Sequence, residues 1–132
     1  MLQNAVRICD ATFGNIYRWD GEALHLAATH NAPPAYAEER RRSPHHRPSP
    51  KIGVGRMVAT KKAVHVVDAA AEPAYTERHP AYVTAVELGG VRTYLTVPML
   101  KESELIGAFT VFRQEVRPFT DKQIALVTAF AA

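Results

Sequence analysis

The feature that most constrains this chain is the alternation of side chains between Arg92 and Leu100. Successive side chains leave an extended strand on opposite faces, so this run predicts a strand with one apolar and one mixed face. The apolar face carries Leu95, Val97 and Met99, and the mixed face carries Arg92, Tyr94 and Thr96. Such a strand must separate two environments, and the rest of the chain has to supply both.

A second strand is predicted directly after the first. The run from Leu105 to Phe112 is apolar on both faces, which is typical of a central strand covered on both sides. The polar residues 101–104 between the two runs suit a hairpin. Asp20-Gly21 marks another hairpin, between strands at 13–19 and 23–30.

Helical patterns lie at both ends and in the middle of the chain. We predict helices over residues 1–11, from the prolines at 33–34 to Arg42, from Gly53 through Ala59, and from Thr120 onward. Thr120 and Gln123 have the spacing of a capping box, and Phe119 is placed to pack on Ile124. The first pattern starts without a cap and the last has no stop signal. We therefore expect one domain, 1–132, taken from a larger protein.

Between these elements lie a short strand and two irregular segments. Residues 63–67 alternate, with Val64 and Val66 on one face and His65 and Val67 on the other. The proline-rich segment 43–50 predicts a surface loop. The connection 68–90 is longer than most, and long connections often cover binding sites.

Composition excludes several classes of protein. A chain of 132 residues can bury a core without disulfides or metals. No apolar run approaches the roughly 20 residues that span a bilayer, so no membrane contact is expected. The single cysteine, Cys9, favours a reducing, cytoplasmic compartment. The net charge of +3 does not by itself indicate a nucleic-acid partner.

Several motifs, taken in order, resemble GAF domains, most closely the sensors of bacterial histidine kinases and other multi-domain signalling proteins. The motifs are the DG hairpin, the GVG helix, VHVVD, AEPAY, LGGVRTYLTVPML and ELIGAFTVFRQEVRPFTDKQIALVTAFA. The resemblance implies an α+β fold with a central antiparallel sheet. It places the terminal helices on one face and a small-molecule pocket under short helices and loops on the other. It also implies that the terminal helices pair in a homodimer and signal to an output domain, a histidine kinase or a cyclase.

The alternation pattern then assigns residues to the pocket. Tyr94 and Thr96 are expected to face it and Arg92 to stand at its rim. The neighbouring strand and the lid are expected to add His65, Val67, Met57, Tyr75, His79 and Tyr82. A closed core would show the same pattern, because amphipathic pockets and satisfied polar cores look alike in sequence. A ligand-free dimerisation and relay module is therefore the alternative function.

The sequence has few of the features that indicate the ligands of other GAF domains. Relatives that bind bilin covalently carry a cysteine in the long connection, and residues 76–88 contain none. Haem would need an axial histidine, for which His65 and His79 are the candidates, but lone histidines are more often satisfied polar residues. Gln123-Ile124 stands where cyclic-nucleotide-binding relatives have an acidic pair. All three cofactors are disfavoured, and the ligand is unidentified.

The remaining chemical patterns favour ordinary structure. Cys9 lies on an apolar helical stripe, so we interpret it as a core residue rather than a nucleophile or redox thiol. Relatives that reduce methionine sulfoxide use several cysteines, and we predict no enzymatic activity. His45-His46 lacks a second ligand cluster for a metal. The basic run 40–42, with Arg47 and Lys51, has no interleaved aromatics and is interpreted as a solvated face rather than a nucleic-acid site.

Overall fold

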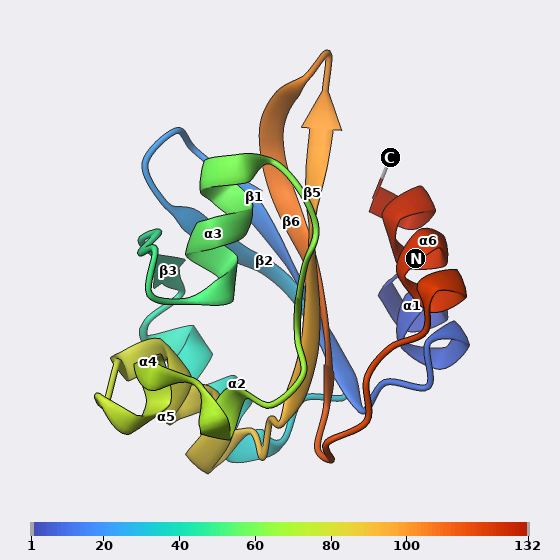
Figure 1. Cartoon of the computed structure of the whole chain (residues 1–132). Coiled ribbons are helices and arrows are strands. Elements are labelled where there is room, and N and C mark those ends of the chain that lie inside the picture. Colours follow the sequence, from blue (N-terminus) through green and yellow to red (C-terminus); the bar gives the residue numbers. More distant parts are fainter. Residues whose placement is uncertain (1, 132) are drawn as a thin grey trace.

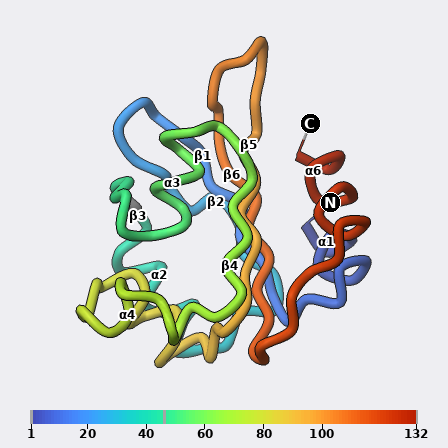
Figure 2. Tube along the Cα trace, in the orientation of Figure 1, coloured from blue at the N-terminus to red at the C-terminus, as the bar shows by residue number. Residues whose placement is uncertain are grey.

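The computed structural model describes residues 2–131, which form a six-stranded sheet with helices on both faces (Figure 1). The strands lie in the order β3-β2-β1-β6-β5-β4, and all neighbours pair antiparallel. Their bounds are β1 (Phe13–Trp19), β2 (Leu24–His30), β3 (His45–His46), β4 (Val64–Val66), β5 (Thr93–Lys101) and β6 (Glu104–Arg113). Figure 2 shows β4 running along the edge of the sheet beside β5. The expected α+β architecture is confirmed.

The two faces of the sheet are covered by different parts of the chain. The terminal helices α1 (Leu2–Ile8) and α6 (Asp121–Ala131) pack together on one face (Figure 1). The opposite face carries α2 (Pro34–Arg42), α3 (Gly53–Thr60), α4 (Pro73–Thr76) and α5 (Pro80–Val83), with the short turns η1 (Ala69–Ala71) and η2 (Thr84–Leu88). Among residues 2–131, no helix is long and apolar enough to cross a membrane.

Alternation along the central strands creates two separate cores. Leu95 and Val97 pack with the terminal helices, whereas Tyr94 belongs to the core on the opposite face. In β6, Phe109 faces the terminal helices and Phe112 faces away from them. The period of two in a strand thus sends neighbouring side chains into different layers. The predicted faces of β5 are confirmed.

Local signals define the ends of these elements as expected. Glu102 and Ser103 link β5 to β6 with φ of 53° and 70°, the left-handed conformation that a two-residue hairpin requires. At the start of α6, the Thr120 N–H donates to Gln123 Oε1 and the Gln123 N–H donates to Thr120 Oγ1. This reciprocal pair is the predicted capping box. The proline-rich segment 43–50 is not wholly irregular, because β3 lies within it and pairs with β2.

Candidate functional site

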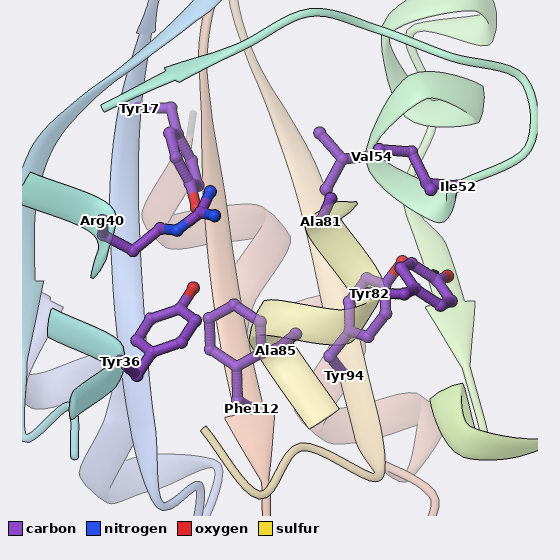
Figure 3. A pocket seen from close by; sticks show the side chains of 10 residues that line it. All are labelled: Tyr17, Tyr36, Arg40, Ile52, Val54, Ala81, Tyr82, Ala85, Tyr94 and Phe112. Carbon is purple, nitrogen blue, oxygen red and sulfur yellow. Dashed lines mark hydrogen bonds between the residues drawn. The ribbon is translucent and has the colours of Figure 1, made fainter. Parts of the chain in front are cut away.

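A small cavity lies between the sheet and the covering helices α2 and α5 (Figure 3). Its volume is about 30 Å³. One water needs roughly 10–15 Å³, so the cavity has room for about two waters or a group of similar size. Its wall consists of Tyr17, Tyr36, Arg40, Ile52, Val54, Ala81, Tyr82, Ala85, Tyr94 and Phe112.

One side of the cavity is polar and is built by β1 and α2. Asn15 is fully buried, and its Nδ2 donates to the hydroxyls of Tyr17 and Tyr36 at 3.0 Å each. The Asn15 Oδ1 has no hydrogen-bond partner. The Arg40 side chain extends from α2 toward these tyrosines (Figure 3), and its Cζ lies 5.8 Å from the centroid of the Tyr36 ring. The arrangement places a cation and two phenols at one wall.

The opposite side is closed by a second hydrogen-bond network. The hydroxyls of Tyr82 and Tyr94 lie 2.7 Å apart. The Tyr82 hydroxyl accepts from the Gly53 N–H and donates to Glu72 Oε1, which also accepts from Arg56. A Cβ on residue 53 would lie 2.3 Å from the Tyr94 hydroxyl oxygen, so only glycine permits this close approach.

Burial keeps the tyrosines of the cavity uncharged. Desolvation raises the pKa of Tyr17 and Tyr82, and it raises the pKa of Tyr36 and Tyr94 well above the ordinary value. At neutral pH, each phenol therefore retains its proton. Phe112, Ile52 and Val54 supply the apolar part of the wall. The cavity thus has one polar end and an apolar wall, and its described lining residues include no nucleophile paired with a base.

A larger open cleft lies outside the cavity and shares Arg40 and Ala81 with it. The volume of this cleft is about 540 Å³. The cleft is also bordered by Glu39, Ser43, His45, Arg47, Pro48, Ser49, His79, Pro80 and Thr84. Arg40 therefore stands at the boundary between the inner cavity and solvent.

Two of the residues predicted for the pocket, Tyr82 and Tyr94, line the cavity. Met57 is fully buried in the same core but is not part of the cavity wall. Thr96 is also fully buried and accepts a hydrogen bond from the Thr110 hydroxyl at 3.0 Å. Whether these residues contact a ligand stays a prediction.

Three other predicted residues lie away from the inner cavity. Arg92 forms a two-pronged ion pair with Asp68, which lowers the pKa of that carboxyl through hydrogen bonding to the guanidinium. The Tyr75 hydroxyl donates to Glu87. His79 caps α5 by accepting from the Ala81 N–H, and it borders the outer cleft. Each of these three has a structural partner.

The predicted face of His65 and Val67 is wrong. In the register of the sheet, His65 pairs with Leu95 and Val66 pairs with Tyr94. Directly paired residues share a face, so His65 points to the terminal helices. Its Nε2 accepts from the Phe119 N–H at 3.1 Å, and Val67 is 46% exposed. The predicted alternation within β4 is correct. Alternation alone, however, does not tell which side chains face the terminal helices and which face the cavity.

Sequence reasoning missed the residues at the polar wall. Arg40 was interpreted as part of a solvated basic run, yet it is only 8% exposed. Its neighbours Arg41 and Arg42 are exposed. The sequence pattern that indicates burial of Arg40 is its helical spacing from Tyr36 and Ala37. These three are the buried residues of α2.

The other chemical candidates are structural. Cys9 is fully buried, its Sγ lies 3.7 Å from the Gln123 carbonyl, and burial raises the pKa of the thiol. The rings of His45 and His25 pack edge to face. Within residues 2–131, no group of three or more His, Cys, Asp or Glu side chains is placed to hold a metal.

Comparisons with known proteins agree with this geometry. A family model for the GAF domain matches residues 1–132. Among solved structures, a GAF/HD domain protein from Geobacter sulfurreducens superimposes with a TM-score of 0.79 and 17% identity, over 99% of this chain and 82% of that chain. No match to a curated protein was found.

Two further structures show how widely this fold is used. A domain described as part of a two-component sensor histidine kinase from Sinorhizobium meliloti 1021 has a TM-score of 0.74 and 17% identity, over 98% of this chain and 80% of that chain. A type II free methionine-R-sulfoxide reductase from Thermoplasma acidophilum has a TM-score of 0.69 and 15% identity, over 99% and 82%. Because the family model spans the whole chain, this protein belongs to the GAF domains, which are generally sensory and regulatory domains of signalling proteins.

Proposed function

We propose that this GAF domain is a sensor that binds a small molecule in the cavity beneath α2 and α5 and relays the binding through α1 and α6. The observation that carries the proposal is the two-sided packing of the sheet. Tyr94 and Phe112 belong to the cavity side, while their strand neighbours Leu95 and Val111 pack under the terminal helices. A ligand that shifts β5 or β6 would therefore act on both layers, because packed cores transmit displacement.

The relay would act on a homodimer and an output domain, a histidine kinase or a cyclase. Family membership supports this part of the proposal, together with the apolar groups that the terminal helices leave accessible. Ile8 is 38% exposed, and Leu126 in α6 is half-buried. Such residues are suited to contact a second copy of the helices. On this proposal the domain works in the cytoplasm as a regulator and not as an enzyme.

Ligand binding is tested with a cavity-filling variant. Ala85 lines the cavity, so Ala85→Leu should fill it, whereas Ala59→Leu adds the same volume at an exposed position in α3. A thermal-shift screen of metabolites and native mass spectrometry of freshly purified protein should both find a ligand. Binding should persist in Ala59→Leu and disappear in Ala85→Leu. Hits that bind Ala85→Leu unchanged would place the ligand elsewhere.

The small volume of the cavity favours a second candidate, a ligand-free dimerisation and relay module. In that case no metabolite would bind, and the terminal helices alone would carry the function. Sedimentation equilibrium should then detect a dimer that Leu126→Glu dissociates, with Lys122→Glu as a control at an exposed position of α6. A strictly monomeric protein at high concentration would contradict dimerisation in both candidates.

A further inference from the structure

The cavity wall contains one charged side chain among the residues that the structure describes, and that side chain is Arg40. Arg40 is 8% exposed, so most of its surface is removed from water. Its Nε is buried and has no hydrogen-bond partner within residues 2–131. A buried cation in this state is unfavourable unless an anion or suitable acceptors compensate for the lost hydration.

No carboxylate within residues 2–131 forms an ion pair with Arg40. The nearest acidic residues on its own helix, Glu38 and Glu39, pair with Arg42 at 3.5 and 3.7 Å. Glu72, near the far wall of the cavity, accepts from Arg56 and Tyr82. The phenols of Tyr17 and Tyr36, which lie beside the guanidinium, keep their protons and carry no charge.

Arg113 shows how the same fold treats a buried arginine whose role is structural. Arg113 is 1% exposed and its guanidinium donates to four backbone carbonyls and to Gln123 Oε1. It also lies over the Phe119 ring, with Cζ 4.0 Å from the centroid. Within residues 2–131, Arg40 has no ion pair; its Cζ lies 5.8 Å from the centroid of the Tyr36 ring, and its charge also acts on the Tyr17 phenol. Unlike Arg113, Arg40 therefore has a guanidinium nitrogen that no group of residues 2–131 satisfies.

The surroundings of Arg40 describe that partner. A guanidinium offers a planar pair of N–H donors that matches a carboxylate. The rest of the wall is apolar or aromatic, including Ile52, Val54 and Phe112. The cavity of about 30 Å³ has room for the carboxylate group of an acid with a short apolar body. The outer cleft adds Arg47, which attracts anions toward Arg40.

Building on the proposed sensory function, we propose that the ligand is a small carboxylic acid whose carboxylate is bound by Arg40. Its short apolar body contacts the aromatic wall. Asn15 is a positioning residue, because its amide holds the hydroxyls of Tyr17 and Tyr36 at the cavity wall near the guanidinium. In the unliganded protein no ion pair within residues 2–131 balances the charge of Arg40, and binding of the acid neutralises it.

The test compares carboxylates with amides of the same shape. Thermal shift and calorimetric titration use acetate and propionate against acetamide and propionamide, at constant ionic strength with chloride as the reference salt. At least one carboxylate should raise the melting temperature, and its amide should not. Arg40→Met should weaken that binding roughly 10- to 100-fold, the usual effect of losing a charge-assisted hydrogen bond. Arg41→Met, an exposed change in the same helix, should leave it unaltered.

Other results would overturn the assignment. These are equal shifts with carboxylates and amides, no shift with any carboxylate, or carboxylate binding that persists in Arg40→Met. A neutral metabolite that Ala85→Leu excludes would retain the sensory function and reject the carboxylate. Arg40→Lys covers a failure of Arg40→Met to fold: it keeps the charge without the paired donors, so binding should be intermediate. Failure of both variants to fold would show that Arg40 is structural.

Discussion

Two buried arginines lie on opposite faces of the same sheet and differ in how fully their hydrogen-bond donors are satisfied. Arg113, under the terminal helices, satisfies its donors with carbonyls of the segments before β1 and after β6. Arg40, beside the cavity, has a buried Nε without a partner. Arg113 therefore joins distant parts of the chain, whereas Arg40 keeps a guanidinium nitrogen that no group of residues 2–131 satisfies. The comparison teaches that burial of an arginine does not define its role, whereas the set of its partners does.

The largest effect is expected on the side of the terminal helices. Arg113→Met leaves several buried carbonyls without donors and removes the ring contact with Phe119. The free energy of unfolding should fall by about 3–5 kcal/mol, as when one partner of a buried polar network is lost. Urea denaturation measures this loss. Arg117→Met is the control at a partly exposed arginine with two surface ion pairs, and it should change stability by less than about 1 kcal/mol. Equal losses in both variants would contradict the role of Arg113.

The next effect concerns the closed wall of the cavity. Gly53→Ala places a methyl group against the Tyr94 hydroxyl and should destabilise the protein by about 1–3 kcal/mol. Tyr94→Phe removes the hydroxyl oxygen, so the double variant should lose less stability than the sum of the two single variants. A double-mutant cycle by urea denaturation measures this coupling. Additive losses would show that the contact between the new methyl group and the Tyr94 hydroxyl does not cause the destabilisation.

A smaller effect of opposite sign is expected for Arg40 without ligand. Arg40→Met removes an uncompensated charge and keeps the apolar stem, so it should stabilise the unliganded protein by about 1 kcal/mol. Arg41→Met again serves as the control and should have no measurable effect. If Arg40→Met destabilised the protein as much as Arg113→Met, Arg40 would have a structural role like that of Arg113.

The smallest effect is a pH dependence at the terminal-helix face. Burial, and then the charge of Arg113, lower the pKa of His65, whose Nε2 accepts from Phe119. The unfolded chain therefore binds the proton more readily than the folded one below pH 6.5. The contribution of neutral His65 to the free energy of unfolding is fully present above that pH. It is lost as the pH drops toward the folded-state pKa. Thermal melts between pH 5 and pH 8 should show this slope, and His65→Gln should reduce it. An unchanged slope would assign it to another group.

Much of the fold follows from local patterns in the sequence. The hairpin at Glu102-Ser103, the capping box of Thr120 and Gln123, and the alternation of β5 each depend on neighbours in the chain. Short-range geometry is sufficient for such features, and all of them were predicted. The position of Tyr82 and Tyr94 at the cavity was likewise anticipated.

The remainder depends on contacts between distant residues. Register with β5 decides that His65 faces the terminal helices, because pairing is set by the neighbouring strand and not by β4 itself. Packing of α2 on the sheet buries Arg40 while Arg41 stays in solvent. The sequence alone determined which side chains share a face, since that is a property of the backbone period. Only the tertiary structure decided which layer each face meets, and so which arginine keeps a buried nitrogen without a partner among residues 2–131.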